Sequence, residues 1–194
     1  MVATLESAVT AAAPDQEALV LIDIQNDYFP GGACEVPGSA EAAMRAAELL
    51  TAFRAGRGPV VHVQHLATRP GSTFFLPGTP GCGLHASVQP RPGEPVVVKH
   101  FPNAFRATEL LEILRRLGVS RLVLAGMMTH MCVDATTRAA WDLGFACTVA
   151  ADACAAPAQA WGGVAVPAEQ VHAAFLAALS GTYARVLPTA ELLR

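Results

Sequence analysis

Apolar runs typical of buried strands alternate along the chain with segments in which apolar residues recur at helical spacing. The runs predict strands over residues 18–25, 59–65, 95–101, 121–127, 146–152 and 183–188. The helical spacing predicts helices over residues 39–56, 106–118, 131–143 and 167–179. We expect Ser39 to cap the first helix, Gly56 to end it, and Pro167 to open the last one.

The strands are apolar along their whole length rather than at every second residue. Such strands are buried on both faces, and strands that alternate with helices form parallel sheets. The pattern therefore predicts an α/β fold of three layers (α/β/α), a doubly wound sheet of six mostly parallel strands. Residues 66–95 interrupt it with six Pro and five Gly. A stretch of this length without periodicity predicts a functional loop or lid.

Composition limits the domain count and the partners. The chain has 194 residues, of which 53% are apolar. That length suits one α/β domain, which we place at residues 16–194, after a loose N-terminal arm over 1–15. A net charge of -3 without charged runs argues against nucleic acid and membrane surfaces as partners. A small molecule or a second copy of the chain is expected instead.

The five cysteines, at positions 34, 82, 132, 147 and 154, form no C-x-x-C pair. An odd number spread through a domain of this size is not a disulfide framework, so a reducing compartment is expected. The first residues lack Lys, Arg and a sustained apolar block, which argues against a signal peptide or membrane anchor. We therefore expect a cytoplasmic protein.

Three residues with reactive side chains stand near expected strand ends. Asp23 interrupts the first apolar run, Lys99 ends the third, and Cys132 follows the fourth at the start of a helix. In doubly wound sheets ligands bind at the carboxyl ends of the strands. Each residue also has an ordinary structural interpretation: Asp23 as a loop cap, Lys99 as a cation that faces solvent, and Cys132 as a small core residue. At a helix start, however, the thiolate of Cys132 is favoured, which suits a nucleophile.

The segments "LVLIDIQNDYFPGG", "VVVKHFPNAF" and "GMMTHMCVDATTRAA" resemble the three signature segments of the isochorismatase-like cysteine hydrolases. The resemblance covers residues 17–188 and implies the strand order 3-2-1-4-5-6, with Asp23, Lys99 and Cys132 as a catalytic triad. It also implies a cis peptide between Met127 and Met128. The implied oxyanion hole is formed by the backbone N–H groups of Met128 and Cys132.

The resemblance implies a cysteine-dependent hydrolase that cleaves an amide or ureido C–N bond of a small molecule through a thioester. Two other functions stay open. An isochorismatase-type vinyl ether hydrolase needs contacts for an anionic substrate, for which Arg69, Arg91 and Arg106 are available. A thiol-based redox or ligand-binding protein could keep the fold without hydrolysis.

Nicotinamidases of this superfamily bind a metal through an Asp-x-His arrangement after the second strand. Here residues 64–85 contain no Asp or Glu. His62 and His65 are three apart on an expected strand and hence on opposite faces. We therefore predict no metal and no cofactor.

The remaining candidates each have two interpretations. Four aromatic residues wall an apolar pocket or pack the loop: Phe29, Phe74, Phe75 and Trp161. Asn26 and Asp27 are loop caps or substrate ligands. We expect His130 to be a hydrogen-bonded turn residue, and Cys34, Cys82, Cys147 and Cys154 to be small packing residues. The Ala-rich helices over 39–56 and 167–179 offer close-packing surfaces, and members of the superfamily commonly form oligomers. We therefore expect a homodimer or a larger homo-oligomer.

Overall fold

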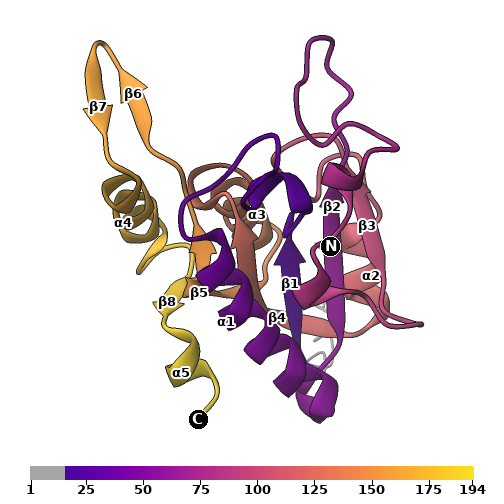
Figure 1. Cartoon of the computed structure of the whole chain (residues 1–194). Helices are drawn as coiled ribbons and strands as arrows, with labels where there is room; N and C mark the ends of the chain where they lie inside the picture. The colour runs from indigo at the N-terminus through magenta and orange to yellow at the C-terminus, as the bar shows by residue number, and fades with distance from the viewer. Residues whose placement is uncertain (1–15) are drawn as a thin grey trace, which may run out of the picture.

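Six parallel strands form one sheet in the order β3-β2-β1-β4-β5-β8 in the computed structural model, which describes residues 16–194 (Figure 1). The expected arm over residues 1–15 lies outside this range. The sheet strands are β1 (Gln16–Ile22), β2 (Val60–His65), β3 (Val96–Lys99), β4 (Val119–Met127), β5 (Ala146–Ala155) and β8 (Arg185–Leu187). Counted within the sheet, this is the order 3-2-1-4-5-6, so the predicted fold is confirmed.

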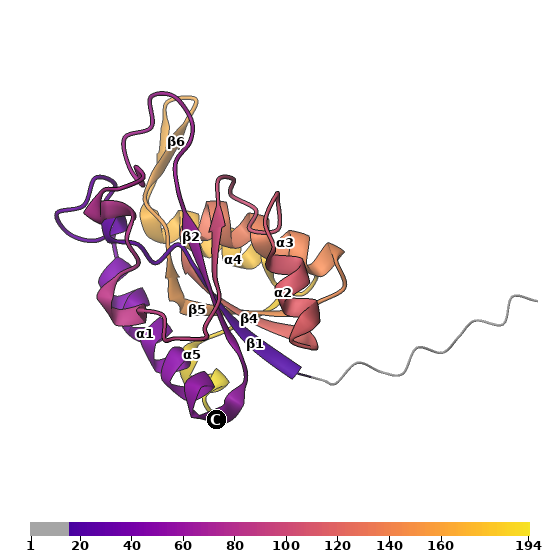
Figure 2. The same cartoon turned by 90° about the vertical axis from the view of Figure 1, so that its right-hand side faces the viewer.

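Helices cover both faces of the sheet (Figure 2). On one face α1 (Ser39–Ala52) and the short α5 (Thr189–Leu192) pack on side chains such as Leu19 and Leu21. On the other, α2 (Leu110–Arg116), α3 (Asp134–Asp142) and α4 (Ala168–Leu179) lie over side chains such as Val20 and Ile22. Consecutive residues of β1 thus enter opposite cores, which explains why the strand is apolar throughout.

Two helix starts differ from the sequence prediction. Gly38, with φ 78°, precedes α1 as its N-cap, and Ser39 is already helical and caps nothing. The helix expected from residue 106 begins only at Leu110. Ala107 has φ 53°, outside the helical region, and the Thr108 side chain accepts the Leu110 N–H at 3.3 Å. The helical spacing of the apolar residues did not reveal these local hydrogen bonds.

The structure contains a hairpin that the sequence pattern did not predict, made of β6 (Gln159–Trp161) and β7 (Val164–Val166). Its strands have three residues each, too short for an alternation to be recognised. The signal was the Gly162–Gly163 pair, whose φ angles of 57° and 81° suit a two-residue hairpin turn. The described structure also has two π-helical turns, η2 (Phe53–Arg57) and η5 (Thr129–Val133), and three 3-10 turns, η1 (Asn26–Tyr28), η3 (Pro80–Cys82) and η4 (Ala86–Val88).

The carboxyl ends of the parallel strands share one edge of the sheet, where residues 26–38 and 66–95 form the loops. Close to this edge, β1 and β4 approach closely at Gly126. A Cβ there would lie 1.9 Å from the carbonyl oxygen of Ile22, so only glycine fits. The peptide bond between Met127 and Met128 is cis. Within residues 16–194, the longest apolar helices are too short to span a bilayer.

Candidate active site

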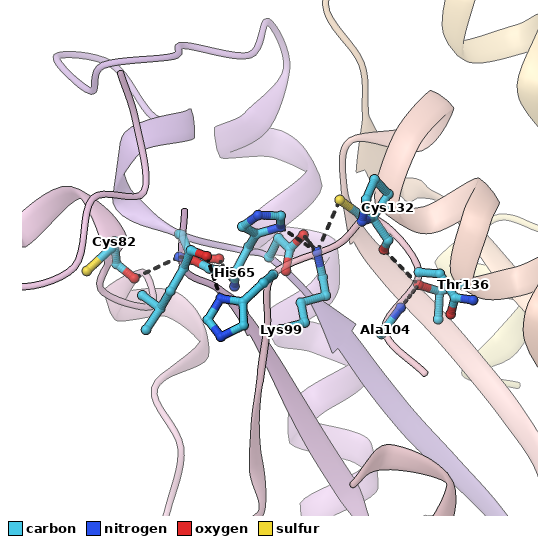
Figure 3. Close-up of polar contacts among 12 residues, drawn as sticks. His65, Cys82, Lys99, Ala104, Cys132 and Thr136 are labelled. Carbon is cyan, nitrogen blue, oxygen red and sulfur yellow. Dashed lines mark hydrogen bonds and ion pairs between the residues drawn. The ribbon is translucent and has the colours of Figure 1, made fainter. Parts of the chain in front are cut away.

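Asp23, Lys99 and Cys132 meet at this edge of the sheet. Asp23 follows β1, Lys99 ends β3, and Cys132 lies in η5 just after β4. The Lys99 Nζ atom lies 2.6 Å from Asp23 Oδ2 and 3.2 Å from the Cys132 Sγ atom (Figure 3). Asp23 and Lys99 are fully buried. One ammonium group therefore contacts both an acid and a thiol in a site almost closed to solvent.

The backbone at this site is strained. Asp23 has φ 51°, a left-handed conformation that only a few per cent of residues other than glycine adopt. Phe75, from the long loop, has φ 55°. Such conformations persist only where surrounding contacts enforce them, and they cluster at functional sites.

Lys99 is the only lysine in the chain. Its strand, β3, is separated from β1 by β2, and neighbouring strands lie about 4.8 Å apart. The side chain therefore passes the end of β2, where it meets His65, and Nζ lies 2.8 Å from His65 Nδ1. From the sequence, a metal ligand was the only role weighed for His65. The signal that could have found it is its position at the end of the intervening strand.

The charges of Asp23 and Lys99 hold each other in place. Burial raises the pKa of Asp23 above its ordinary value, although the Lys99 ammonium opposes this shift. Burial alone would lower the pKa of Lys99, but the charge of Asp23 and the hydrogen bonds to Asp23 and Cys132 outweigh this effect, so the pKa is raised and the lysine stays an ammonium. A carboxylate of raised pKa beside a fixed cation is a competent proton acceptor.

Cys132 differs from the sequence expectation. Burial, followed by the nearby charge of Asp23, raises the pKa of its thiol far above the ordinary value, and Lys99 only partly offsets this. The thiol, not the thiolate, is the resting form. The expected benefit of a helix start was wrong because Cys132 lies inside η5, buried and 4% exposed, rather than at an exposed first turn. A thiol in this state can act as a nucleophile only after a base removes its proton.

One group of metal-ligating atoms exists within residues 16–194. Asp23, His65 and Cys132 offer a carboxylate oxygen, an imidazole nitrogen and a sulfur, all within 4.8 Å of one another. However, Lys99 Nζ lies within 3.2 Å of each of these residues. A cation already occupies the position that a metal would need, so these residues do not suit a metal centre.

A cavity of about 230 Å³ opens beside Cys132. This is smaller than the ~300–1,000 Å³ of pockets for drug-sized ligands, which indicates a small substrate. Its walls are aromatic and apolar with a few polar groups: Tyr28, His65, Ala67, Thr68, Arg69, Ser72, Phe74, Phe75, His100, Pro102, Met128, Met131 and Cys132.

Two of the four aromatic candidates line this cavity, namely Phe74 and Phe75. Phe29 instead stacks on His85, with ring centroids 3.7 Å apart. Trp161 lies in the β6–β7 hairpin and is 88% exposed. Of the two interpretations, walling the cavity fits Phe74 and Phe75 but not Phe29 and Trp161, because the path of the loops carries the latter two away from the cavity of the single chain.

Short polar residues after β1 anchor the long loop. Asp27 accepts the Phe75 N–H at 2.6 Å and the Ala33 N–H at 3.2 Å, and Asn26 donates to the Pro80 carbonyl at 2.8 Å. Gly81 is required here, since a Cβ would lie 2.0 Å from the Asp27 carboxylate. Of the two interpretations, loop capping is the one that the contacts support.

The remaining candidates are structural. The Nδ1 atom of His130 is buried without a hydrogen-bond partner among the described residues, and the ring packs edge-on against Phe175, so the predicted hydrogen-bonded role was wrong. A different histidine, His172 of α4, contacts Thr129 of η5, the turn that carries Cys132, at 2.9 Å. Cys34 is half-buried, and three further free cysteines are buried: Cys82, Cys147 and Cys154.

The three reactive groups at the carboxyl edge of this sheet define the class of isochorismatase-like hydrolases, and comparison with known proteins agrees. Residues 17–191 match the isochorismatase domain, so the chain belongs to the isochorismatase family. The sequence is 48% identical to the uncharacterized isochorismatase family protein YddQ of Bacillus subtilis, over 91% of this chain and 98% of that protein.

A solved structure, a putative isochorismatase hydrolase from Oleispira antarctica, superimposes with a TM-score of 0.90. It shares 48% identity with the chain, over 95% of this chain and 99% of that one. A third relative, the maleamate amidohydrolase of Pseudomonas putida, is 33% identical over 66% of this chain and 67% of its own length. The chain is therefore an enzyme of a hydrolase family that includes amidohydrolases.

Proposed function

We propose that the protein is a cysteine-dependent amidohydrolase that cleaves an amide or ureido C–N bond of a small molecule through a thioester. The observation that carries the proposal is the contact of Lys99 Nζ with both Asp23 and Cys132, at 2.6 and 3.2 Å, beside a small cavity. The maleamate amidohydrolase relative supports C–N bonds as the target.

In the first half of the reaction Asp23 takes the proton of the Cys132 thiol, and the thiolate attacks the substrate carbonyl carbon. The carbonyl electron pair moves to oxygen, where the backbone N–H groups of Met128 and Cys132 stabilise the charge. The tetrahedral intermediate collapses, the C–N bond breaks, and protonated Asp23 returns the proton to the leaving nitrogen. Ammonia or an amine departs, and the acyl group stays on sulfur.

In the second half Asp23 removes a proton from water, and the hydroxide attacks the thioester carbonyl. Collapse breaks the C–S bond and releases the acid, and Asp23 returns the proton to sulfur. Lys99 holds Asp23 in position throughout and stabilises the negative charge on sulfur when it forms. Because the resting thiol has a raised pKa, this proximity of base and cation is what makes attack possible.

The arginines favour an amide over a substrate with several acid groups. Among Arg69, Arg91 and Arg106, only Arg69 lines the cavity. The Arg106 guanidinium lies 3.8 Å from the ring centroid of Phe101, and the backbone N–H of Arg91 contacts Glu94. One cation at the cavity suits at most one substrate carboxylate, which argues against the vinyl ether hydrolase.

The proposal extends to the state of the protein. We propose that residues 16–194 act as one hydrolase domain in the cytoplasm, where the five free cysteines stay reduced. We also propose a homodimer or larger assembly. Exposed apolar side chains support this: Trp161 is 88%, Val164 64% and Met44 61% exposed. Light scattering on the purified protein tests the assembly, and a monomeric mass would contradict it.

The test of function is a panel of small primary amides and ureido compounds assayed for ammonia release, with isochorismate in parallel. We expect at least one amide to be hydrolysed. Cys132→Ala should abolish the activity, whereas Cys147→Ala, which removes a buried cysteine near the start of β5, should retain it. Turnover of isochorismate alone, or ammonia release by Cys132→Ala at the wild-type rate, would overturn the proposal.

A further inference from the structure

The ammonium group of Lys99 has three N–H donors, and three acceptor groups of other residues surround it. Besides Asp23 and Cys132, it contacts the Nδ1 atom of His65 at 2.8 Å. Lysine has no acceptor, so Nδ1 must accept, and the proton of the neutral imidazole must sit on Nε2. With all three donors used, the orientation of the ammonium group is fixed.

His65 is itself held firmly. Its backbone N–H donates to the Gln25 side-chain oxygen at 2.7 Å, and its carbonyl accepts from the Gln25 side-chain nitrogen at 2.9 Å. In the sheet it is the register partner of Lys99 on the neighbouring strand. Gln25 is fully buried. The backbone of His65 is thus fixed by the segment that follows β1 and by the sheet, which places the imidazole on the path that the Lys99 side chain takes toward Asp23.

The surroundings keep His65 neutral. Burial, and then the positive charges of Lys99, His100 and Arg69, lower its pKa to about 4. No Asp or Glu lines the cavity, and the acidic groups that cluster with His65 within residues 16–194 are Asp23 and the Cys132 thiol. At neutral pH Nδ1 is therefore available as an acceptor.

We propose that His65 is a positioning residue, which accepts the third hydrogen bond of Lys99 and so directs the ammonium group at Asp23 and Cys132. The proposal rests on the role of Lys99 in the proposed function. Without this acceptor a buried N–H loses its partner, and the ammonium group is free to rotate away from the sulfur. His65 would then control the reactivity of Cys132 without touching the reacting atoms.

Matched variants separate the acceptor from the shape of the ring. In His65→Asn the side-chain oxygen takes the place of Nδ1, whereas His65→Leu has similar bulk and no acceptor. The readout is the rate of Cys132 alkylation by iodoacetamide, measured by the mass of the peptide that contains Cys132, which needs no substrate. The control is His85→Leu, because His85 stacks on Phe29 outside the cavity.

At neutral pH we expect His65→Leu to slow alkylation at least about tenfold and to move its pH profile upward, since the thiolate is stabilised less. His65→Asn should stay within about threefold of wild type, and His85→Leu should match it. Alkylation of His65→Leu at the wild-type rate and pH, or equal loss in the Asn and Leu variants, would overturn the proposal. If the enzyme shows these alkylation rates but hydrolyses no amide, the proposed function is wrong and the positioning role of His65 stands.

A second measurement uses the wild-type protein and does not depend on the folding of a variant. Because Lys99 is the only lysine, labelling with ε-15N lysine gives one side-chain ammonium signal. Imidazole 15N spectra at neutral pH should show His65 protonated on Nε2. The Lys99 signal should be protected from exchange and should change in His65→Leu but not in His65→Asn. A His65 proton on Nδ1 would contradict the proposal.

Discussion

In the proposed mechanism Asp23 is the base and Cys132 the nucleophile, and both contact the ammonium group of Lys99. A buried thiol of raised pKa is a poor nucleophile, and a buried carboxylate is a base only if it stays ionised. Lys99 meets both requirements because it lowers the pKa of each neighbour. Among single residues, the proposed mechanism therefore depends most on the positive charge of Lys99.

Replacing Lys99 by Met keeps most of the length and removes the charge. The pKa of Asp23 should then rise further, and since the carboxylate is the active base, the acid limb of the kcat/KM profile should move to higher pH. We expect turnover at neutral pH to fall about a hundredfold or more. Rates on an accepted amide across pH measure both effects. An unchanged acid limb would mean that Lys99 does not act on Asp23.

The sequence predicted which residues meet but not how they are supported. Asp23, Lys99 and Cys132 were candidates because each lies near the end of a strand, and parallel strand ends share an edge. The resemblance to the isochorismatase-like cysteine hydrolases then grouped them as one site. His65 was not, because its role depends on the path of the Lys99 side chain across β2. Likewise, the strained φ of Asp23 and the burial of Cys132 depend on tertiary contacts that no spacing records.

At the scale of elements, Asp27 connects η1 with the loop that carries Phe74 and Phe75. Its two oxygens accept two backbone N–H groups, from Phe75 and Ala33. The loop has few elements of its own, so this anchor fixes one wall of the cavity.

The substitution Asp27→Asn leaves only one accepting oxygen, so one of these hydrogen bonds is lost. We expect KM to rise several-fold, roughly threefold to tenfold, with a smaller change in kcat, and protease cleavage of residues 66–95 to become faster. The control is Asp152→Asn, because Asp152 holds Thr189 at the start of α5, away from the cavity. It should leave KM unchanged, and an equal rise in KM would contradict the anchoring role.

A second anchor joins the turn before β3 to η2, the π-helical turn that follows α1. Glu94 accepts two hydrogen bonds from Arg54, both at 2.7 Å, and lies 3.0 Å from His62 Nε2. The hydrogen bonds from Arg54 are the largest cause that lowers the pKa of Glu94 from 4.5 to about 2. A lowered pKa stabilises the fold above about pH 4.5, and the contribution is lost as the pH falls toward 2.

Glu94→Gln should therefore lower the free energy of unfolding at pH 7 by about 1–3 kcal/mol. The difference from wild type should shrink as the pH falls through this window. Urea unfolding at several pH values measures it. Glu48→Gln serves as a control, because the Arg45–Glu48 pair is about half exposed and should contribute little. A pH-independent difference would show that the Glu94 charge is not the cause.

Element boundaries were less predictable than element types. The apolar runs predicted all six sheet strands, whereas the starts of α1 and α2 depend on Gly38, Ala107 and Thr108, which act through local φ angles and side-chain hydrogen bonds. The β6–β7 hairpin was missed because three-residue strands carry too little pattern.

At the scale of the whole molecule, the sheet order brings four sequence segments to one edge in the order β3, β2, β1, β4. Each contributes one polar side chain to the site: Lys99, His65, Asp23 and Cys132. Two of them lie within the strand ends and two just beyond, so the fold itself assembles the site. In the proposed mechanism, carbonyl attack uses only groups of this one chain.

Chelation tests this self-sufficiency. Because the Lys99 ammonium occupies the centre of the candidate ligand group, treatment with EDTA followed by dialysis should leave turnover of an accepted amide unchanged. Untreated enzyme dialysed in parallel is the control. Loss of activity that zinc or iron restores would show that a metal takes part.

The most direct test of the account is to trap the acyl group on Cys132. Wild-type enzyme is mixed with an accepted amide, quenched in acid during turnover, digested and analysed by mass spectrometry. The account predicts an acyl adduct on the peptide that contains Cys132, and no adduct or turnover in Cys132→Ala. Hydroxylamine should accelerate the slow step, which is the release of the acyl group from sulfur. Turnover by Cys132→Ala at the wild-type rate, or an adduct on another residue, would contradict the assignment of Cys132 as the nucleophile.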